Sequence, residues 1–537
     1  MCLGVGLVLA GGCRRSAPAA PPELLFGWHS VGTAHLDNDT NTARLREIWS
    51  LPASVELRDQ TLQKLARAPL DFLAGGAALA EEQRTALVKP LLDDLLQSES
   101  FAEARARSNQ PPACALAIRL DDARASVWRT HLHELVTGQK ADAALTGDWL
   151  DSRPGALGGT NQVGFARVGE WVVVRFGQAG SPNIHQDLLH RIKTSGRPAP
   201  VATNYYLQAE VNLPSLAERG ALAKTVAWPA AQLTLVGKED HLRTNLRLRY
   251  PRAQNWALEP WNVPTNIMHD PPRNQMTSLL AARGFGPWLS RQPVANELEL
   301  KSAPDQFFLW SQSVIAFQTF AALPVGNAAD LLTRLREWLP ANIPTRLLQS
   351  GLVKVIWATN RSRIEFLGLP IMFPYIEAAP GTNGTFLAAG LLPLPRNTNP
   401  PPTELLAELT GQTNLLFYEW EVSEARLLHW RVLSQIASIL AGQRPATTNR
   451  LSQRWIEAIA PKLENSVTQI TVSSPQELNL VRKSHLGCSS LELLALAYWL
   501  DDPEFPKWQI PDVFRPPPPG SHPRPVPPVG APGGSAK

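Results

Sequence analysis

The stretch QLTLVGKEDHLRTNLRLRY, residues Gln232–Tyr250, decides the fold class of this chain. Its second part alternates leucines with polar residues, so an extended strand would have one apolar and one polar face. A shorter run, Gln232–Val236, precedes it across a turn that we place at Gly237. Two such runs joined by a short turn predict an antiparallel hairpin with one face packed and the other in solvent. The polar positions are Arg243, Asn245, Arg247 and Arg249.

Similar pairs of short strands recur on both sides of this hairpin, and helical patterns separate them. The predicted pairs are Val163–Arg167 with Trp171–Gly177, Phe307–Trp310 with Val314–Phe320, and Val467–Val472 with Glu477–Lys483. The predicted helices include Asp39–Ser50, Glu81–Gln97, Asp121–Val136, Ile184–Thr194, Ala328–Trp338 and Ser423–Leu440. Because most connections are hairpins, we expect an α+β fold of mainly antiparallel sheets with helices packed on one face.

The order of these elements also predicts an internal duplication. Hairpin, helix, strand and closing hairpin follow one another in residues 161–290, and again, with inserted strands, in residues 291–502. After each closing hairpin a related string appears, Ser278–Leu289 and Ser490–Leu500. We therefore expect two related units, preceded by an N-terminal α+β region at residues 24–160.

The ends of the chain have a different character from its body. Residues 1–13, MCLGVGLVLAGGC, form a short apolar run that ends in small residues and Cys13, as bacterial lipoprotein signals do. Residues 14–23 would be a tether, and residues 503–537 a proline-rich disordered tail. The prediction is a signal peptide with lipid on Cys13, and thus a membrane-anchored envelope protein facing the periplasm or the cell surface. Another exported form and a cytosolic protein are the alternatives.

Composition narrows the choice of partners. The net charge of +4 comes from 51 basic and 47 acidic residues that are spread evenly, so no basic face suited to nucleic acid is expected. The expected partners are the membrane, through the lipid, and an envelope protein or glycan. Outside the signal, Cys114 and Cys488 are the two remaining cysteines. In an exported protein they could form a disulfide, and the alternative is two small buried thiols.

Known catalytic and cofactor motifs are missing from the sequence. It has no GxSxG, Walker A, GxGxxG, CxxC or HExxH pattern, so neither a cofactor nor a metal site is expected. Glu419 and Glu421 share one face of a predicted strand and could serve acid–base chemistry, but solubility of an edge strand is the favoured interpretation. The connector 251–272 carries Trp256, Trp261 and His269, which either line a ligand pocket between the units or attach the connector to them.

Three stretches carry a resemblance to a known group of proteins. They are Asp39–Pro52, Gln60–Leu65 and the run Arg482-Lys-Ser-His-Leu-Gly, which ends at residue 487. Together they resemble uncharacterised exported proteins of Verrucomicrobia-like bacteria, within a wider group of envelope proteins that share a domain of unknown function. The resemblance implies an envelope location and brings no activity, ligand or catalytic residue.

The sequence therefore favours a non-enzymatic envelope lipoprotein that binds a ligand or partner. The alternatives are an enzyme without a recognisable linear motif, such as a glycan-acting hydrolase with two carboxylates, and a purely structural envelope scaffold.

Overall fold

The structure is a computed structural model. It describes residues 21–507 apart from 38, 69–78, 108–109, 141–144, 146, 155–159, 200–204, 224–225, 257, 265–275, 301, 313–315, 343–353, 359–361, 370, 382–383, 393–401 and 441–449. Three predictions lie outside the described residues: the lipidated Cys13, the binding residue His269 and nearly all of the proline-rich tail.

The elements fall into a first half, residues 23–249, and a second half, residues 276–501. The first half contains β1 (Glu23–Ser30), α1 (Thr33–Leu36), η1 (Thr40–Thr42), α2 (Ala43–Ser50), α3 (Pro52–Arg67), α4 (Glu81–Gln97), β2 (Ser100–Ala106), β3 (Ala113–Arg119), α5 (Asp122–Thr137), β4 (Trp149–Pro154), β5 (Thr160–Val168), β6 (Trp171–Gln178), α6 (Ile184–Ser195), β7 (Leu207–Asn212), α7 (Leu213–Glu218), β8 (Ala230–Lys238) and β9 (His241–Arg249).

The second half contains β10 (Met276–Arg283), α8 (Gly286–Leu289), α9 (Pro293–Glu297), β11 (Gln306–Gln312), β12 (Thr319–Val325), α10 (Ala328–Asn342), β13 (Lys354–Trp357), β14 (Arg363–Leu367), β15 (Tyr375–Gly381), β16 (Gly384–Gly390), α12 (Thr403–Thr410), β17 (Leu415–Val422), α13 (Ser423–Leu440), α14 (Leu451–Ile459), η2 (Ala460–Lys462), β18 (Asn465–Ser474), β19 (Glu477–Ser484) and α15 (Ser490–Asp501).

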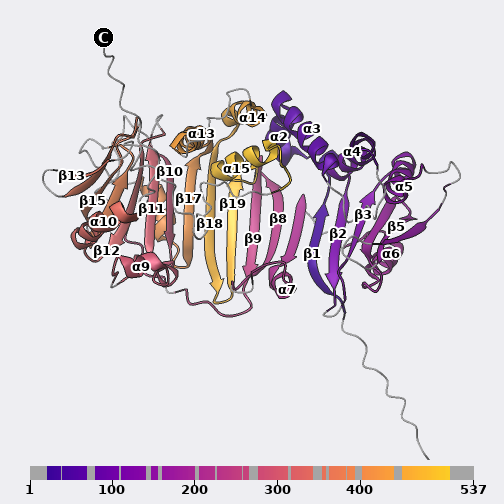
Figure 1. Ribbon diagram of the computed structural model, residues 1–537, viewed down its shortest axis with the longest axis horizontal. Coiled ribbons are helices and arrows are strands. Elements are labelled where there is room, and N and C mark those ends of the chain that lie inside the picture. The colour runs from indigo at the N-terminus through magenta and orange to yellow at the C-terminus, as the bar shows by residue number, and fades with distance from the viewer. Residues whose placement is uncertain are drawn as a thin grey trace, which may run out of the picture.

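The strands of the described residues form one sheet along the long axis of the molecule, with antiparallel pairings (Figure 1). This confirms the predicted α+β class and its antiparallel sheet. The order across the sheet is β4, β5, β6, β3, β2, β1, β7, β8, β9, β19, β18, β17, β10, β11, β12, β16, β15, β14, β13.

The same pairing order occurs in both halves. In the first half it runs β5, β6, β3, β2, β1, β7, β8, β9, and in the second β15, β16, β12, β11, β10, β17, β18, β19. Strands β9 and β19 pair with each other and so join the halves. The two similar sequence strings that follow the closing hairpins differ in conformation. Ser278 lies in strand β10, whereas Ser490 is the first residue of helix α15. That part of the predicted correspondence is wrong.

Helices cover both faces of the sheet, so the prediction of helices on one face is wrong. Ile118 and Val174 pack in a cluster with Trp128 of α5, whereas their neighbours on the same strands pack with Leu188 of α6. Since successive side chains of a strand point to opposite faces, α5 and α6 lie on opposite sides of the sheet. The neighbouring residues in the α6 cluster are Ala117 and Val173.

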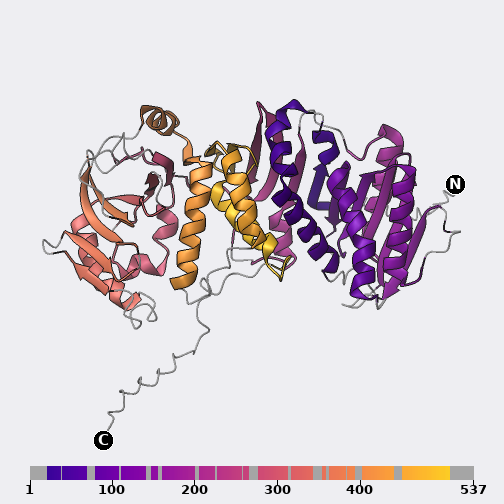
Figure 2. The same ribbon diagram turned by 90° about the horizontal axis from the view of Figure 1, so that it is seen from above.

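In the middle of the molecule the helices of the two halves pack against each other. In Figure 2 the indigo helices of the first half lie beside the orange and yellow helices of the second. Leu57 of α3 belongs to one apolar cluster with Ile456 of α14 and Leu493 of α15. The indole of Trp455 donates to the hydroxyl of Ser54, at 3.0 Å. This helical layer is a second contact between the halves, in addition to the pairing of β9 with β19.

The hairpin that opened the sequence analysis forms as predicted, but its turn lies two residues later. Strands β8 and β9 pair up to Lys238 and His241, so Glu239 and Asp240 form the turn. Both have positive φ, 53° and 63°, as a two-residue type I′ hairpin turn requires. Gly237 lies within β8 instead, where a Cβ atom would fall 2.0 Å from the hydroxyl of Tyr206.

Candidate metal centre

Three potential metal ligands meet at the end of the sheet where the halves join. His241 is the first residue of β9, Glu464 immediately precedes β18, and His485 immediately follows β19. Strand β19 is antiparallel to both neighbours, so its last residue lies at the same edge as the first residues of β9 and β18. The strand order therefore brings together residues that are up to 244 positions apart in the chain.

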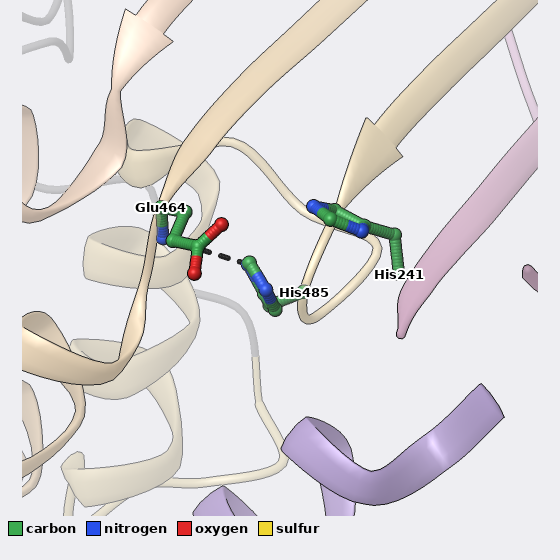
Figure 3. Close-up of side chains that lie close together, drawn as sticks. All are labelled: His241, Glu464 and His485. Carbon is green, nitrogen blue, oxygen red and sulfur yellow. Dashed lines mark hydrogen bonds between the residues drawn. The ribbon is translucent and has the colours of Figure 1, made fainter. Parts of the chain in front are cut away.

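The geometry of this cluster suits a small cation. The potential ligand atoms of His241, Glu464 and His485 all lie within 4.8 Å of one another, and His485 lies between the other two (Figure 3). The two imidazole rings have their centroids 4.4 Å apart, at 38°. His485 is buried, His241 is half-buried and Glu464 is exposed. The site thus has a fixed inner ligand and an outer ligand that can move.

Hydrogen bonds help to determine which ring nitrogens are available. Nδ1 of His241 lies 2.9 Å from the carbonyl oxygen of Glu239, which can only accept, so Nδ1 carries the proton and Nε2 keeps its lone pair. A carbonyl behind the ring is the usual support of a metal-binding histidine. Nδ1 of His485 accepts from the backbone N–H of Glu464 at 3.5 Å, which is long for a hydrogen bond. Little is lost when Nδ1 exchanges this bond for a bond to a metal.

The residues present fit an ion after one movement. A tetrahedral zinc-type ion with bonds of about 2.0–2.2 Å holds its ligand atoms roughly 3.4 Å apart, which is closer than 4.8 Å. The ligand atoms must therefore move closer together, and the exposed Glu464 is the ligand with the most room to move. Two imidazoles and one carboxylate are a three-ligand set that leaves at least one coordination position open. The arrangement can hold a divalent ion and still accept a ligand from solvent.

Burial, helped by nearby positive charge, favours the neutral form of the inner imidazole. The pKa of His485 is lowered by burial first, and then by His241 and Arg44, against the opposing effect of Glu464 and Asp240. A neutral imidazole is the form that binds metal, so this environment favours the ligand state. Nη2 of Arg44, on α2, lies 3.8 Å from Oε1 of Glu464 and competes with a metal for that carboxylate.

Helix α2 and the short helix η1 before it are attached to the turn between β8 and β9. The backbone N–H of Arg44 donates to Oδ1 of Asp240 at 2.8 Å, and Oδ1 of Asn41 accepts from the N–H of Glu239 at 3.2 Å. Lys462, just before β18, pairs with Glu47 of α2 at 2.5 Å. The cluster is therefore surrounded by elements of both halves.

The connector tryptophans attach the connector to the sheet. Trp261 packs against the apolar cluster around Phe308 and lies under the guanidinium of Arg283, 4.5 Å from its ring centroid. The indole of Trp256 donates to the carbonyl of Pro475 at 3.2 Å. A cavity of about 240 Å³ near Leu298, Val325 and Leu331 has none of these connector residues in its lining. A ligand-binding role for Trp256 and Trp261 stays a prediction.

The two acidic residues of β17 are not on an edge strand, so the solubility interpretation is wrong. β17 lies between β10 and β18 and contacts α13. Glu421 is 1% exposed, and its Oε1 accepts from the backbone N–H and hydroxyl of Ser490 at 2.8 and 2.7 Å. The hydroxyl of Ser466 donates to the same atom at 3.1 Å. These bonds give Glu421 a structural role between the sheet and the helices.

The disulfide that the sequence left open is not formed, because Cys114 and Cys488 are free thiols. Cys114 lies on β3, and Cys488 follows β19, six strand positions away across the sheet. At about 4.8 Å per strand this is roughly 30 Å, far beyond the ~7 Å limit between the Cα atoms of a disulfide. The alternative interpretation, two separate small thiols, fits the structure, in which both residues are half-buried.

Burial should make both thiols slow to react. It raises the pKa of Cys114 and of Cys488 to about 11. Since only the thiolate reacts, we expect alkylation near pH 8 to be at least ~100-fold slower in the native protein than in denaturant. Mass spectrometry of the labelled peptides measures each rate. Resistance to labelling in denaturant without reductant would instead show that the two are bonded.

Sequence reasoning missed the whole His241–Glu464–His485 cluster. The sequence does carry two signals, a histidine next to a hairpin turn and a histidine directly after the closing strand. Neither indicates a site until the order of the strands is known. No family model, curated protein or solved structure matches this chain.

Proposed function

We propose that this protein binds a divalent transition-metal ion, zinc or an ion of similar chemistry, through His241, Glu464 and His485. The observation that carries the proposal is the convergence of these three residues within 4.8 Å. Two imidazoles and a carboxylate suit zinc-like ions better than magnesium or calcium, which prefer oxygen ligands. The donors come from both halves of the chain, so a bound ion joins β9 to β18 and β19.

An envelope location is the second part of the proposed function. In this proposal the protein is an exported, non-enzymatic lipoprotein that is anchored by a lipid on Cys13. Its ligand is the metal ion, and nucleic acid is not among its partners. The N-terminal sequence supports the envelope location, and the even charge distribution supports the absence of a nucleic-acid partner. No helix among the described residues combines the length and apolarity that a bilayer crossing needs.

Gene duplication is the third part, and the recurring pairing order supports it. The pairing scheme suggests units of about residues 23–249 and 276–484, in place of 161–290 and 291–502. In these units β1 corresponds to β10, and β9 to β19. The metal cluster then lies beside the pair of equivalent strands that join the two copies.

Calorimetric titration tests the metal proposal. Zn²⁺ or Co²⁺ should bind the purified protein in a one-to-one ratio, and saturation at 100 times the Kd should stabilise it by about 2.7 kcal/mol. His485→Ala and His241→Ala should each weaken binding at least ~100-fold, because even supporting residues of metal sites contribute 10–100-fold. The control is His190→Ala, which removes an exposed imidazole from α6. Equal affinities in all four proteins would refute the assignment.

A further inference from the structure

Two cationic side chains face each other next to the candidate metal centre. Arg243 and Lys483 are directly opposite in the pairing of β9 with β19. Each lies two residues from a histidine of the cluster along its own strand direction, Arg243 after His241 and Lys483 before His485. Residues two apart in a strand point to the same face, so Arg243 lies on the face of the sheet that carries His241, and Lys483, directly opposite, points to that face as well.

Neither Arg243 nor Lys483 has an ion-pair partner among the described residues. Farther along the same face, Arg247 and Arg249 both pair with Glu477, at 3.4 Å each. The residues beside Arg243 and Lys483 in the sheet are Val236 and Val467, which cannot neutralise a charge. Nε of Arg243 is buried, and no described residue forms a hydrogen bond with it.

Two opposed cations without counter-charges are unfavourable unless an anion binds to them. Like charges directly opposite on antiparallel strands destabilise a sheet, and a buried donor without an acceptor adds a further cost. An occupied metal site would add two positive charges to those of Arg44, Arg243 and Lys483, against the negative charges of Glu464 and Asp240. The local excess of positive charge then calls for a ligand with more than one negative charge.

We infer that Arg243, Lys483 and the open position of the metal together form a binding site for a phosphate-type dianion, an inference that rests on the proposed metal function. One oxygen of the phosphoryl group binds the metal. The others accept from the guanidinium of Arg243 and the ammonium of Lys483, which are the usual protein partners of phosphate. A monoanionic carboxylate neutralises less of the charge and should bind more weakly.

The test uses the Co²⁺-loaded full-length protein, because the visible spectrum of Co²⁺ reports a new ligand on the metal. Inorganic phosphate and glycerol phosphate should both change this spectrum and bind at least ~10-fold more tightly than acetate. Tighter binding of glycerol phosphate would indicate a phosphate ester as the natural ligand, and tighter binding of inorganic phosphate would indicate the free ion.

Arg243→Gln and Lys483→Gln should each weaken phosphate binding at least ~10-fold while Co²⁺ still binds. The matched control is Arg249→Gln, on the same strand and face, which already pairs with Glu477. Unchanged phosphate affinity in both variants, or no phosphate binding to the Co²⁺-loaded protein, overturns the anion site and leaves the metal proposal standing. Phosphate binding that depends on Arg243 and Lys483 in a protein that takes no metal overturns the metal proposal instead.

Discussion

Glu421→Ala is expected to lower the free energy of unfolding by about 3–5 kcal/mol, because it removes one partner from a buried charged network. Glu421 is 1% exposed, and the substitution leaves the donors of Ser466 and Ser490 without their acceptor. Arg426, 3% exposed, also loses the nearby negative charge and keeps a hydrogen bond to Ser311 at 2.8 Å. Denaturant unfolding of the variant and the wild type measures the difference.

Glu424→Ala is the matched control. Glu424 is exposed, three residues along, in the first turn of α13, where its carboxylate contributes at most about 1 kcal/mol through the helix dipole. A loss for Glu421→Ala no larger than that of the control would mean that the network does not hold the helices on the sheet.

Glu419→Gln is expected to stabilise the protein at neutral and alkaline pH. Burial, with Glu421 nearby, raises the pKa of Glu419 to about 7. Because the folded-state pKa lies above the unfolded value of about 4.3, the cost of ionising Glu419 is absent below about pH 4 and rises until about pH 7. Arg426 of α13 and Arg482 of β19 oppose this shift, and Glu492 of α15 adds to it. Partial exposure limits the gain to roughly 1–2 kcal/mol.

Unfolding curves near pH 4 and near pH 8 measure this effect. The stability difference between Glu419→Gln and the wild type should appear only at the higher pH. Glu404→Gln, in an exposed first turn of α12, should follow the wild type at both. A Glu419→Gln variant that is equally stabilised, or equally destabilised, at the two pH values would contradict a shifted carboxyl.

The sequence is sufficient to predict the local structure and the antiparallel sheet, but not the order of the strands within it. Alternating leucines and polar residues predicted the hairpin that contains Arg243 and Arg247, since that pattern depends only on strand geometry. It could not show that β17 is a central strand, because the position of a strand in a sheet is decided by partners far away in the chain. For this reason the sequence alone favours a surface position for Glu419 and Glu421.

The candidate metal centre could not be predicted for the same reason. His241 and His485 belong to different halves, and only the pairing of β9 with β19 brings them together. A linear metal motif keeps its ligands on one short segment, whereas here the ligands lie at three strand ends. The sequence also could not show which face of the sheet each helix covers. Helices α5 and α6 both follow apolar strands, yet they pack on opposite faces.

A crystal structure of the protein grown with Zn²⁺, with diffraction recorded on both sides of the zinc absorption edge, tests the central claim most directly. We expect one strong anomalous peak between His241, Glu464 and His485, about 2.0–2.2 Å from a ring nitrogen of each histidine and from a carboxylate oxygen of Glu464. No peak there, or a peak only at other residues, would contradict a metal centre at the junction of the two halves.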